Sequence, residues 1–299
     1  MNGERVLKLG LPKGSLEQAT IELFRKAGWK ISGSERSYFP SIDDPEIRGA
    51  LLRPQEMPRY IADGTLDAGV TGKDWIVENG VELTIVADFI YSKVSRRPTR
   101  WVLAVPAEST IQRIEDLRGK RIASEMTNFT RRYFAERNIE VHVEFSWGAT
   151  EAKAAEGLVD AIVEVTETGS TIRAHGLRII ADLLESNPQL VANPVALADP
   201  WKREKIHQIE RLVMGAMAAE SQVGIKMNVR HDHLEQVIAL IPSLTAPTVA
   251  HLHPTPNLRG EHWLSVESVI SEATVRELVP KLLAAGAVGI IEYPLNKVL

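Results

Sequence analysis

Short strand and helix signals alternate over residues 1–90, and this alternation constrains the fold more than any other feature of the chain. An apolar run at Val6–Leu11 is followed by an amphipathic segment at Leu16–Ala27 that ends at Gly28. The same order returns with a helical pattern over Glu56–Asp63, an apolar run at Leu66–Val70, and a loop at residues 71–74 that opens another helix at Trp75. Strands and helices in such short order predict an α/β domain with a mainly parallel sheet. Ligands of these sheets bind at the carboxyl ends of the strands, so we expect a site in the loops that follow them.

The segment from Asp160 to Arg173 has the pattern of a buried strand that runs into an anion-binding loop. The strand is rich in β-branched residues, as in parallel strands covered on both faces: Val159, Ile162, Val163 and Val165. The loop supplies hydroxyl donors, a glycine that lets a ligand approach the backbone, and a helix start: Thr168, Gly169, Ser170 and Thr171. Two carboxylates, Glu164 and Glu167, indicate a ligand with hydroxyls or a divalent cation, such as a ribose phosphate with Mg²⁺. The alternative is a helix-capping turn that binds nothing.

A weak internal repeat relates residues 63–70 to residues 156–163. In each copy an acidic residue and a glycine end a helix, and an aspartate opens a strand. Two similar lobes facing a cleft would produce this repeat, and so would coincidence between two ordinary helix–strand junctions. Residues 95–100 resemble a crossover, and three prolines between 188 and 200 mark the return. We therefore predict a discontinuous first lobe, residues 1–95 plus 185–218, and a second lobe at residues 96–184.

After Trp201 the pattern changes to that of a separate domain. A linking helix has one apolar face: Ile206, Ile209, Val213 and Ala216. Strand patterns then occupy residues 223–229, 248–252, 263–269 and 288–293, and helical patterns occupy 234–241 and 275–285. Thr274 and Glu277 have the spacing of a capping box for the second helix. This βαββαβ order predicts a ferredoxin-like domain over residues 219–299.

Composition excludes several classes of protein. The chain has 299 residues, a formal net charge of −4 and no cysteine. The charge argues against a general nucleic-acid binder, and the lack of cysteine excludes disulfide scaffolds, thiolate metal sites and cysteine nucleophiles. No apolar run reaches membrane-spanning length and neither end reads as a signal segment, so we expect a cytoplasmic protein without membrane contact.

Several other polar side chains are candidates for the cleft or for a metal. Lys13 follows an apolar run, Arg53 precedes Pro54, and Arg96, Arg97 and Arg100 lie near the crossover. Such cations suit a polyphosphate, although ordinary surface charges are the alternative. Asp67 opens a strand, and Glu125 and Asn128 follow another apolar run. Five histidines gather late in the chain: His231, His233, His251, His253 and His262. His251 and His253 would share a strand face and could hold a metal, but solvent-facing histidines are the favoured interpretation.

Three motifs, Leu11–Leu16, Asp67–Asp74 and Glu164–Arg173, together resemble ATP phosphoribosyltransferase, the enzyme that opens histidine biosynthesis. The similarity covers essentially the whole chain, and the C-terminal segment resembles the regulatory domain of the long form. The resemblance implies a two-lobed core like the type II periplasmic binding proteins, followed by an ACT-like ferredoxin-like domain. It also implies transfer of the phosphoribosyl group of phosphoribosyl pyrophosphate (PRPP) to N1 of ATP with release of pyrophosphate, with Mg²⁺ required.

The resemblance also assigns residues. Glu167, Thr168, Gly169, Ser170 and Thr171 would cradle the 5′-phosphate of PRPP, and Glu164 would bind the ribose hydroxyls, with aspartate at this position in many relatives. Lys13 and Gly14 would lie beside the pyrophosphate or nucleotide, and Arg53, Asp67 and Thr71 would line the same cleft. Of these, Glu164, Lys13 and Arg53 are the predicted catalytic residues. Mg²⁺ would be held through the substrate phosphates, with Glu164 as the candidate protein ligand.

The same resemblance implies regulation and assembly. Asn228, Leu244 and Thr248 fall where the family binds histidine as an allosteric inhibitor. Some relatives have aspartate in place of Asn228. The family further suggests a hexamer that exchanges with dimers. Two other classes of function remain open from the residues: a two-lobed solute-binding module, and a metabolite-sensing regulator built on the ferredoxin-like domain.

Overall fold

The computed structural model describes residues 5–33, 38–89, 98–244, 246–253 and 262–299. Two compact units divide the chain: residues 1–25 with 29–210, and residues 211–299 with 26–28. Arg96 and Arg97 fall outside the described residues. Within the described stretches, no helix combines the length and the apolar character that a membrane crossing requires.

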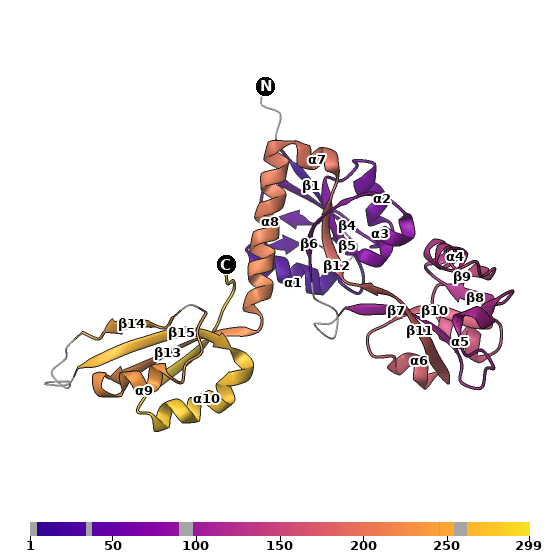
Figure 1. Ribbon diagram of the computed structural model, residues 1–299. Coiled ribbons are helices and arrows are strands. Elements are labelled where there is room, and N and C mark those ends of the chain that lie inside the picture. Colours follow the sequence, from indigo (N-terminus) through magenta and orange to yellow (C-terminus); the bar gives the residue numbers. More distant parts are fainter. Residues whose placement is uncertain (1–4, 34–37, 90–97, 245, 254–261) are drawn as a thin grey trace. The chain divides into compact units, whose positions relative to one another are not determined.

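The first sheet of the larger unit has five strands in the order β4-β1-β5-β12-β6. The strands are β1 (Leu7–Pro12), β4 (Ile47–Leu52), β5 (Ala68–Gly72), β6 (Thr84–Asp88) and β12 (Pro188–Ala192). β1 runs parallel to both of its neighbours, as predicted, whereas β12 enters antiparallel between β5 and β6. Figure 1 shows β12, from late in the chain, among the indigo and violet strands.

Helices and a short ribbon complete this first lobe. They are α1 (Glu17–Ala27), α2 (Met57–Ala62), α3 (Lys73–Asn79), α7 (Pro194–Ala198), β2 (Ile31–Ser32) and β3 (Ser41–Ile42). The prediction of a loop before a helix at Trp75 was wrong. Strand β5 continues through Thr71 and Gly72, and α3 begins directly at Lys73 because extended Gly72 serves as its N-cap.

The second sheet of the same unit has the order β11-β7-β10-β8-β9. The strands are β7 (Thr99–Pro106), β8 (Arg121–Ser124), β9 (His142–Phe145), β10 (Ala161–Thr166) and β11 (Leu177–Ser186). Around them lie α4 (Thr127–Ala135), α5 (Thr150–Ala155), α6 (Ser170–Ala174) and the 3₁₀ turn η1 (Ile114–Leu117). Apolar clusters cover both faces of the sheet, which agrees with the β-branched composition of β10.

The two segments of the weak repeat occupy equivalent places in the two sheets. Asp63 and Glu156 are the C-caps of α2 and α5, and each is followed by a glycine with positive φ, +78° at Gly64 and +71° at Gly157. The chain then enters β5 or β10, each the central strand of its five-stranded sheet. Glycine suits both positions because side chains rarely adopt this left-handed backbone conformation.

The smaller unit contains the predicted βαββαβ order. Its elements are β13 (Gln222–Arg230), η2 (His231–His233), α9 (Leu234–Ile238), β14 (Thr248–His251), β15 (Trp263–Ser271), α10 (Glu272–Ala284) and β16 (Val288–Pro294). The sheet order β14-β15-β13-β16 is antiparallel throughout and matches a ferredoxin-like fold. In the chain, helix α8 (Pro200–Ala219) precedes it, and all four residues of its predicted apolar face are fully buried.

The predicted capping box at Thr274 was wrong. Helix α10 begins at Glu272, two residues earlier, with Ser271 as an N-cap whose side chain caps no N–H group. Thr274 therefore lies inside the first turn, where its hydroxyl donates to the Ser271 carbonyl at 2.7 Å. The helix starts directly at the end of β15, so the strand end places the cap.

Candidate active site

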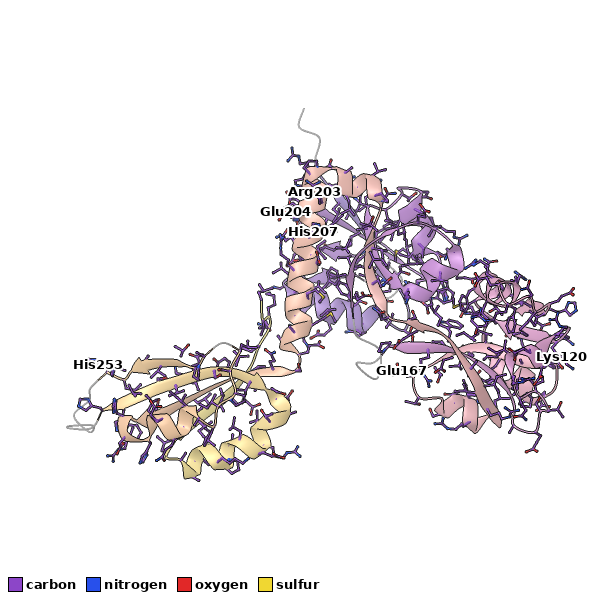
Figure 2. The ribbon with its side chains drawn as sticks, in the orientation of Figure 1. Lys120, Glu167, Arg203, Glu204, His207 and His253 are labelled. Carbon is purple, nitrogen blue, oxygen red and sulfur yellow. The ribbon has the colours of Figure 1, made fainter. Side chains whose placement is uncertain are left out.

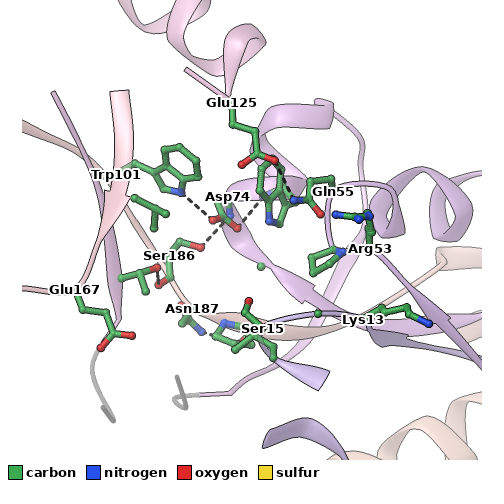
Figure 3. Close-up of a pocket in the computed structure, with 18 residues that line it drawn as sticks. Lys13, Ser15, Arg53, Gln55, Asp74, Trp101, Glu125, Glu167, Ser186 and Asn187 are labelled. Carbon is green, nitrogen blue, oxygen red and sulfur yellow. Dashed lines mark hydrogen bonds between the residues drawn. The ribbon is translucent and has the colours of Figure 1, made fainter. Parts of the chain in front are cut away.

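A cavity of about 360 Å³ lies in the larger unit, where strands of both sheets end. Its walls include residues that directly follow the ends of β1, β4 and β10: Lys13 and Gly14, Arg53, and Glu167. Figure 3 shows Lys13 and Arg53 on one side of the cavity and Glu167 on the other. Because ligands of α/β sheets bind beyond the carboxyl ends of strands, this cavity is the candidate active site.

Two cations of the first lobe are held by aromatic rings. The Lys13 ammonium lies 4.2 Å from the centroid of the Tyr38 ring, and the Arg53 guanidinium lies 5.6 Å from that of Trp147. Beside Lys13, Gly14 has a φ of +105° and donates its N–H to the Glu17 carboxylate at 3.2 Å. Both cations line the cavity, and Arg53 has no carboxylate partner among the ion pairs of the described residues.

The back wall of the cavity is built around the buried carboxylate of Asp74. Its Oδ2 accepts from Trp101 Nε1 at 2.8 Å, its Oδ1 accepts from the Trp75 N–H at 2.9 Å, and its own N–H donates to Ser186 Oγ at 3.1 Å. These bonds join α3 of the first lobe to strands β7 and β11 of the second. Burial raises the pKa of Asp74, and the hydrogen bonds from Trp101, Ser186 and Trp75 partly offset that rise.

A second contact between the lobes involves Glu125, which lines the cavity. Its Oε1 accepts from Gln55 Nε2 at 3.0 Å, and burial raises its pKa. Asn128, the other candidate of that segment, serves a different purpose. Its N–H and that of Phe129 donate to the buried Glu78 carboxylate at 3.0 and 2.8 Å, which caps the start of α4.

The hydroxyl-rich loop lies at the end of β10, and only its first residue reaches the cavity wall. Glu167 lines the cavity and lies beside the start of β7 (Figure 2). The next four residues do not line it: Thr168, Gly169, Ser170 and Thr171. Gly169 has a φ of +74°, and its N–H donates to the Thr166 hydroxyl at 2.8 Å, while the Ser170 N–H donates to Thr168 at 3.3 Å. The N–H groups of Gly169 and Ser170 therefore donate to nearby threonine hydroxyls and not to backbone carbonyls.

Glu164 lies on the opposite face of β10 from the cavity-lining Val165. It shares that face with Ile162, which packs under α5 and α6. Its carboxyl accepts from the Val165 N–H at 3.1 Å and bonds the Thr150 hydroxyl. Burial, aided by the negative charges of Glu151 and Glu125, raises the pKa of Glu164 from 4.5 to about 7. The carboxyl is therefore held in a polar niche at the strand end, beside the hydroxyl-rich loop.

Glu164 makes the stability of the protein fall with rising pH. In the unfolded chain the carboxyl ionises near pH 4.5, but in the fold it keeps its proton until about pH 7. Between these values the folded state binds more protons, so its stabilisation by this group declines as pH rises. We expect Glu164→Gln, which mimics the protonated form, to melt at a higher temperature than the native chain above pH 7 and at a similar temperature near pH 4.5. Melting curves of both proteins from pH 4.5 to 8 measure the difference, and a constant difference across this range would contradict the assigned pKa.

Comparison with known proteins identifies the family. Residues 53–215 match the family described as ATP phosphoribosyltransferase, and residues 219–297 match the C-terminal domain of HisG. The ATP phosphoribosyltransferase of Solidesulfovibrio magneticus is 60% identical over all of both chains, and ATP phosphoribosyltransferase 1 of Geobacter sulfurreducens is 58% identical over 98% of this chain and 99% of that one. The chain belongs to the ATP phosphoribosyltransferase family of histidine biosynthesis.

The family assignment covers the long form, with its C-terminal domain. A solved structure, the ATP phosphoribosyl transferase (HisG:HisZ) complex from Thermotoga maritima, is similar with a TM-score of 0.61 and 29% identity over 70% of this chain and 96% of that one. The predicted α/β fold class, with a two-lobed core and a C-terminal four-stranded domain, is confirmed. The protein is an enzyme, so the readings as a solute-binding module or a sensor without catalysis were wrong.

Two residues expected in the cleft of this phosphoribosyltransferase contact other parts of the first lobe. Asp67 is 6% exposed and accepts from the Lys8 N–H at 2.8 Å and from Lys202 Nζ at 2.7 Å. The Thr71 hydroxyl donates to the Pro54 carbonyl at 3.0 Å. Neither residue lines the cavity. Arg100, at the start of β7, pairs with Asp182 across the strand at 2.8 Å.

The three predicted effector residues lie in the smaller unit. Asn228 on β13 is half-buried, whereas Leu244 and Thr248 are exposed. Asn228 pairs with Ser265 and Thr248 with Glu267, so both side chains project from the face of the sheet opposite its apolar core. His251 lies at the end of β14, and Figure 2 labels His253 beyond it. Within the described ranges, no three His, Asp or Glu side chains gather as a metal site.

Sequence reasoning missed much of the inner wall of the cavity. Gln55, Trp75, Trp101 and Ser186 were not singled out, and Asp74 was noted only as the end of a motif. The pattern contained one signal: Asp74 comes two residues after the buried strand β5, and Trp101 lies near the start of the buried strand β7. Because Asp74 and Trp101 come from different lobes, their pairing required the three-dimensional arrangement.

Proposed function

We propose that this enzyme transfers the phosphoribosyl group of PRPP to N1 of ATP, giving phosphoribosyl-ATP and pyrophosphate as the first step of histidine biosynthesis. The observation that carries the proposal is the cavity that Lys13 and Arg53 line from one lobe and that Glu167, the first residue of the hydroxyl-rich loop, lines from the other. Cations suit polyphosphates, and carboxylates with hydroxyls suit a ribose phosphate. The family provides the reaction type.

The proposed chemistry needs positioning more than a strong base. Displacement of pyrophosphate from the anomeric carbon develops positive charge on the ribose and negative charge on the leaving group. Glu164 would bind the ribose hydroxyls and oppose the positive charge, while Lys13 and Arg53 would stabilise the departing phosphates. The loop from Glu167 to Thr171 would hold the 5′-phosphate after its hydroxyls exchange their internal bonds for phosphate oxygens.

The residues present fit a requirement for Mg²⁺. Glu164 is buried near Glu151 and Glu125, and their mutual repulsion, which helps raise the pKa of Glu164, is what a divalent cation would relieve. Mg²⁺ in such sites is usually held by one or two carboxylates together with substrate phosphates. Glu164 is the proposed protein ligand. When bound, the ion neutralises charge on the leaving pyrophosphate.

Regulation and assembly complete the proposal. Histidine would act as the feedback inhibitor at Asn228, Leu244 and Thr248 in the smaller unit. The active protein would be a cytoplasmic homo-oligomer, a hexamer that exchanges with dimers. The Thermotoga maritima structure is a complex of two kinds of chain, HisG and HisZ, which supports association as a property of relatives.

A single assay tests this proposal. Purified full-length protein with ATP, PRPP and MgCl₂ is expected to form phosphoribosyl-ATP and pyrophosphate in equal amounts, with both products followed by chromatography. EDTA should abolish product and excess MgCl₂ should restore it, and added histidine should lower the rate and shift the size distribution in gel filtration. Absence of phosphoribosyl-ATP under all of these conditions would overturn the proposed reaction, and unchanged rates with histidine would overturn the regulation alone.

A further inference from the structure

We propose that Trp147 is the stacking platform for the adenine ring of ATP and thereby sets the affinity for the nucleotide. The inference rests on the proposed function, because it assigns a residue to the second substrate of that reaction. Trp147 is 64% exposed, although tryptophan is highly buried on average.

The segment that presents Trp147 is held firmly on both sides. Ser146 is 1% exposed, its N–H donates to the Ser124 carbonyl at 3.1 Å, and its hydroxyl bonds Thr150 at 2.9 Å and accepts from Lys153 Nζ at 2.8 Å. Ala149 has a φ of +51°, which is strained for a residue with a side chain. Such over-determined backbone costs stability and is typical of functional sites. The exposed indole is therefore presented by a segment whose backbone is fixed by the hydrogen bonds of Ser146.

The neighbours of Trp147 connect it to both substrates. Its ring lies under the guanidinium of Arg53, which lines the cavity. Three residues along the chain, the Thr150 hydroxyl bonds the carboxyl of Glu164, the proposed ribose ligand. The exposed ring thus contacts a cation assigned to phosphates, and its segment also supplies the hydroxyl that bonds the residue assigned to the ribose. A ligand that is both anionic and planar matches this pair, since the guanidinium attracts its phosphates and the indole stacks on its base.

Adenine is the planar part of the two substrates, since PRPP contains no aromatic ring. Base–aromatic stacking of this kind is strong enough to control affinity. The alternative is that Trp147 only positions Arg53 for phosphate. These two roles predict different responses to a polyphosphate without a base.

The test compares Trp147→Ala and Trp147→Phe with the native enzyme. We expect the KM for ATP to rise roughly tenfold in Trp147→Ala and to stay within about twofold in Trp147→Phe, because loss of one base–aromatic stack has this size. The KM for PRPP and inhibition by inorganic tripolyphosphate should not change. ATP should also quench part of the tryptophan fluorescence of the native protein, and this part should be missing from Trp147→Ala.

Phe145 provides the matched control, since it is another aromatic side chain of the same segment and is 65% exposed. Phe145→Ala should keep the native KM for ATP and the native quench. The inference is overturned if Trp147→Ala retains the native KM for ATP, or if tripolyphosphate inhibition weakens as much as ATP binding. Failure of the proposed function is distinguishable, because the native enzyme would then form no phosphoribosyl-ATP at all.

Discussion

A Glu164→Ala variant is expected to lose at least about 100-fold in kcat while it remains folded, because a preorganised charge next to the reacting centre contributes on this order. Glu164 is the one carboxyl fixed at the end of β10 by the Val165 N–H and the Thr150 hydroxyl. Alanine removes the acceptor for the ribose hydroxyls and the negative charge that opposes the developing positive charge. Steady-state rates with ATP and PRPP measure the loss, and circular dichroism checks the fold.

Two controls separate this role from a structural one. Glu156→Gln removes an exposed carboxylate at the far end of α5 and should leave kcat within about twofold of the native value, as expected for an exposed surface charge. Glu164→Gln keeps the shape but not the charge, so it should lose nearly as much activity as the alanine variant. For the native enzyme, kcat/KM should rise with pH through about 7, where Glu164 ionises. A Glu164→Gln variant with native turnover would show that the charge has no part in catalysis.

An Asp74→Ala variant is expected to be destabilised by about 2 to 3 kcal/mol, because the Trp101 indole N–H, which is 1% exposed, would lose its acceptor. A protein of this size loses about 2–4 °C in melting temperature per kcal/mol, so the transition of the larger unit should fall by about 5–10 °C. Differential scanning calorimetry resolves this transition from that of the smaller unit. The same variant also removes the side-chain hydrogen bond that joins α3 to β7.

Asp74→Asn is the matched control for the buried wall. Its amide oxygen still accepts from Trp101, and burial already favours the protonated form of the native carboxyl, whose pKa is raised. We therefore expect Asp74→Asn to melt closer to the native protein than Asp74→Ala does, because it keeps the acceptor for Trp101 and loses only the acceptor for the Trp75 N–H. If Asp74→Ala melted at the native temperature, the bond to Trp101 would contribute no net stability.

Much of the fold was predictable because each element carries its own periodic pattern. The strand that contains Leu7, Leu9 and Leu11 is buried, and the βαββαβ order of the smaller unit is present as predicted. The position of β12 was not predictable in the same way. Its antiparallel entry between β5 and β6 depends on partners that lie about 100 residues away in the chain, and neither the pattern of Pro188–Ala192 nor its turns specifies them.

The candidate site likewise contains some residues whose positions could be predicted from the sequence and some contacts that could not. Lys13 and Glu167 each follow a predicted strand, and ligands bind beyond the carboxyl ends of such strands, so a place for each of them at the site could be predicted. The hydrogen bond between Asp74 and Trp101 and the contact of Arg53 with Trp147 could not, because the partners belong to different lobes. Asp67 shows the converse: the resemblance placed it in the cleft, but the Lys8 N–H and Lys202 bond it away from the cavity.

Local patterning was therefore sufficient for many of the elements, for the βαββαβ order of the smaller unit, for the fold class and for the loops that bear the chemistry, because hydrophobic period and turn chemistry are properties of neighbouring residues. The contacts between the two lobes could be identified only from the tertiary structure. Which carboxylates are buried, how far the pKa of Glu164 rises, and which aromatic ring stays exposed beside Arg53 all depend on desolvation and distance between segments remote in the chain, and these arise only when the sheets pack.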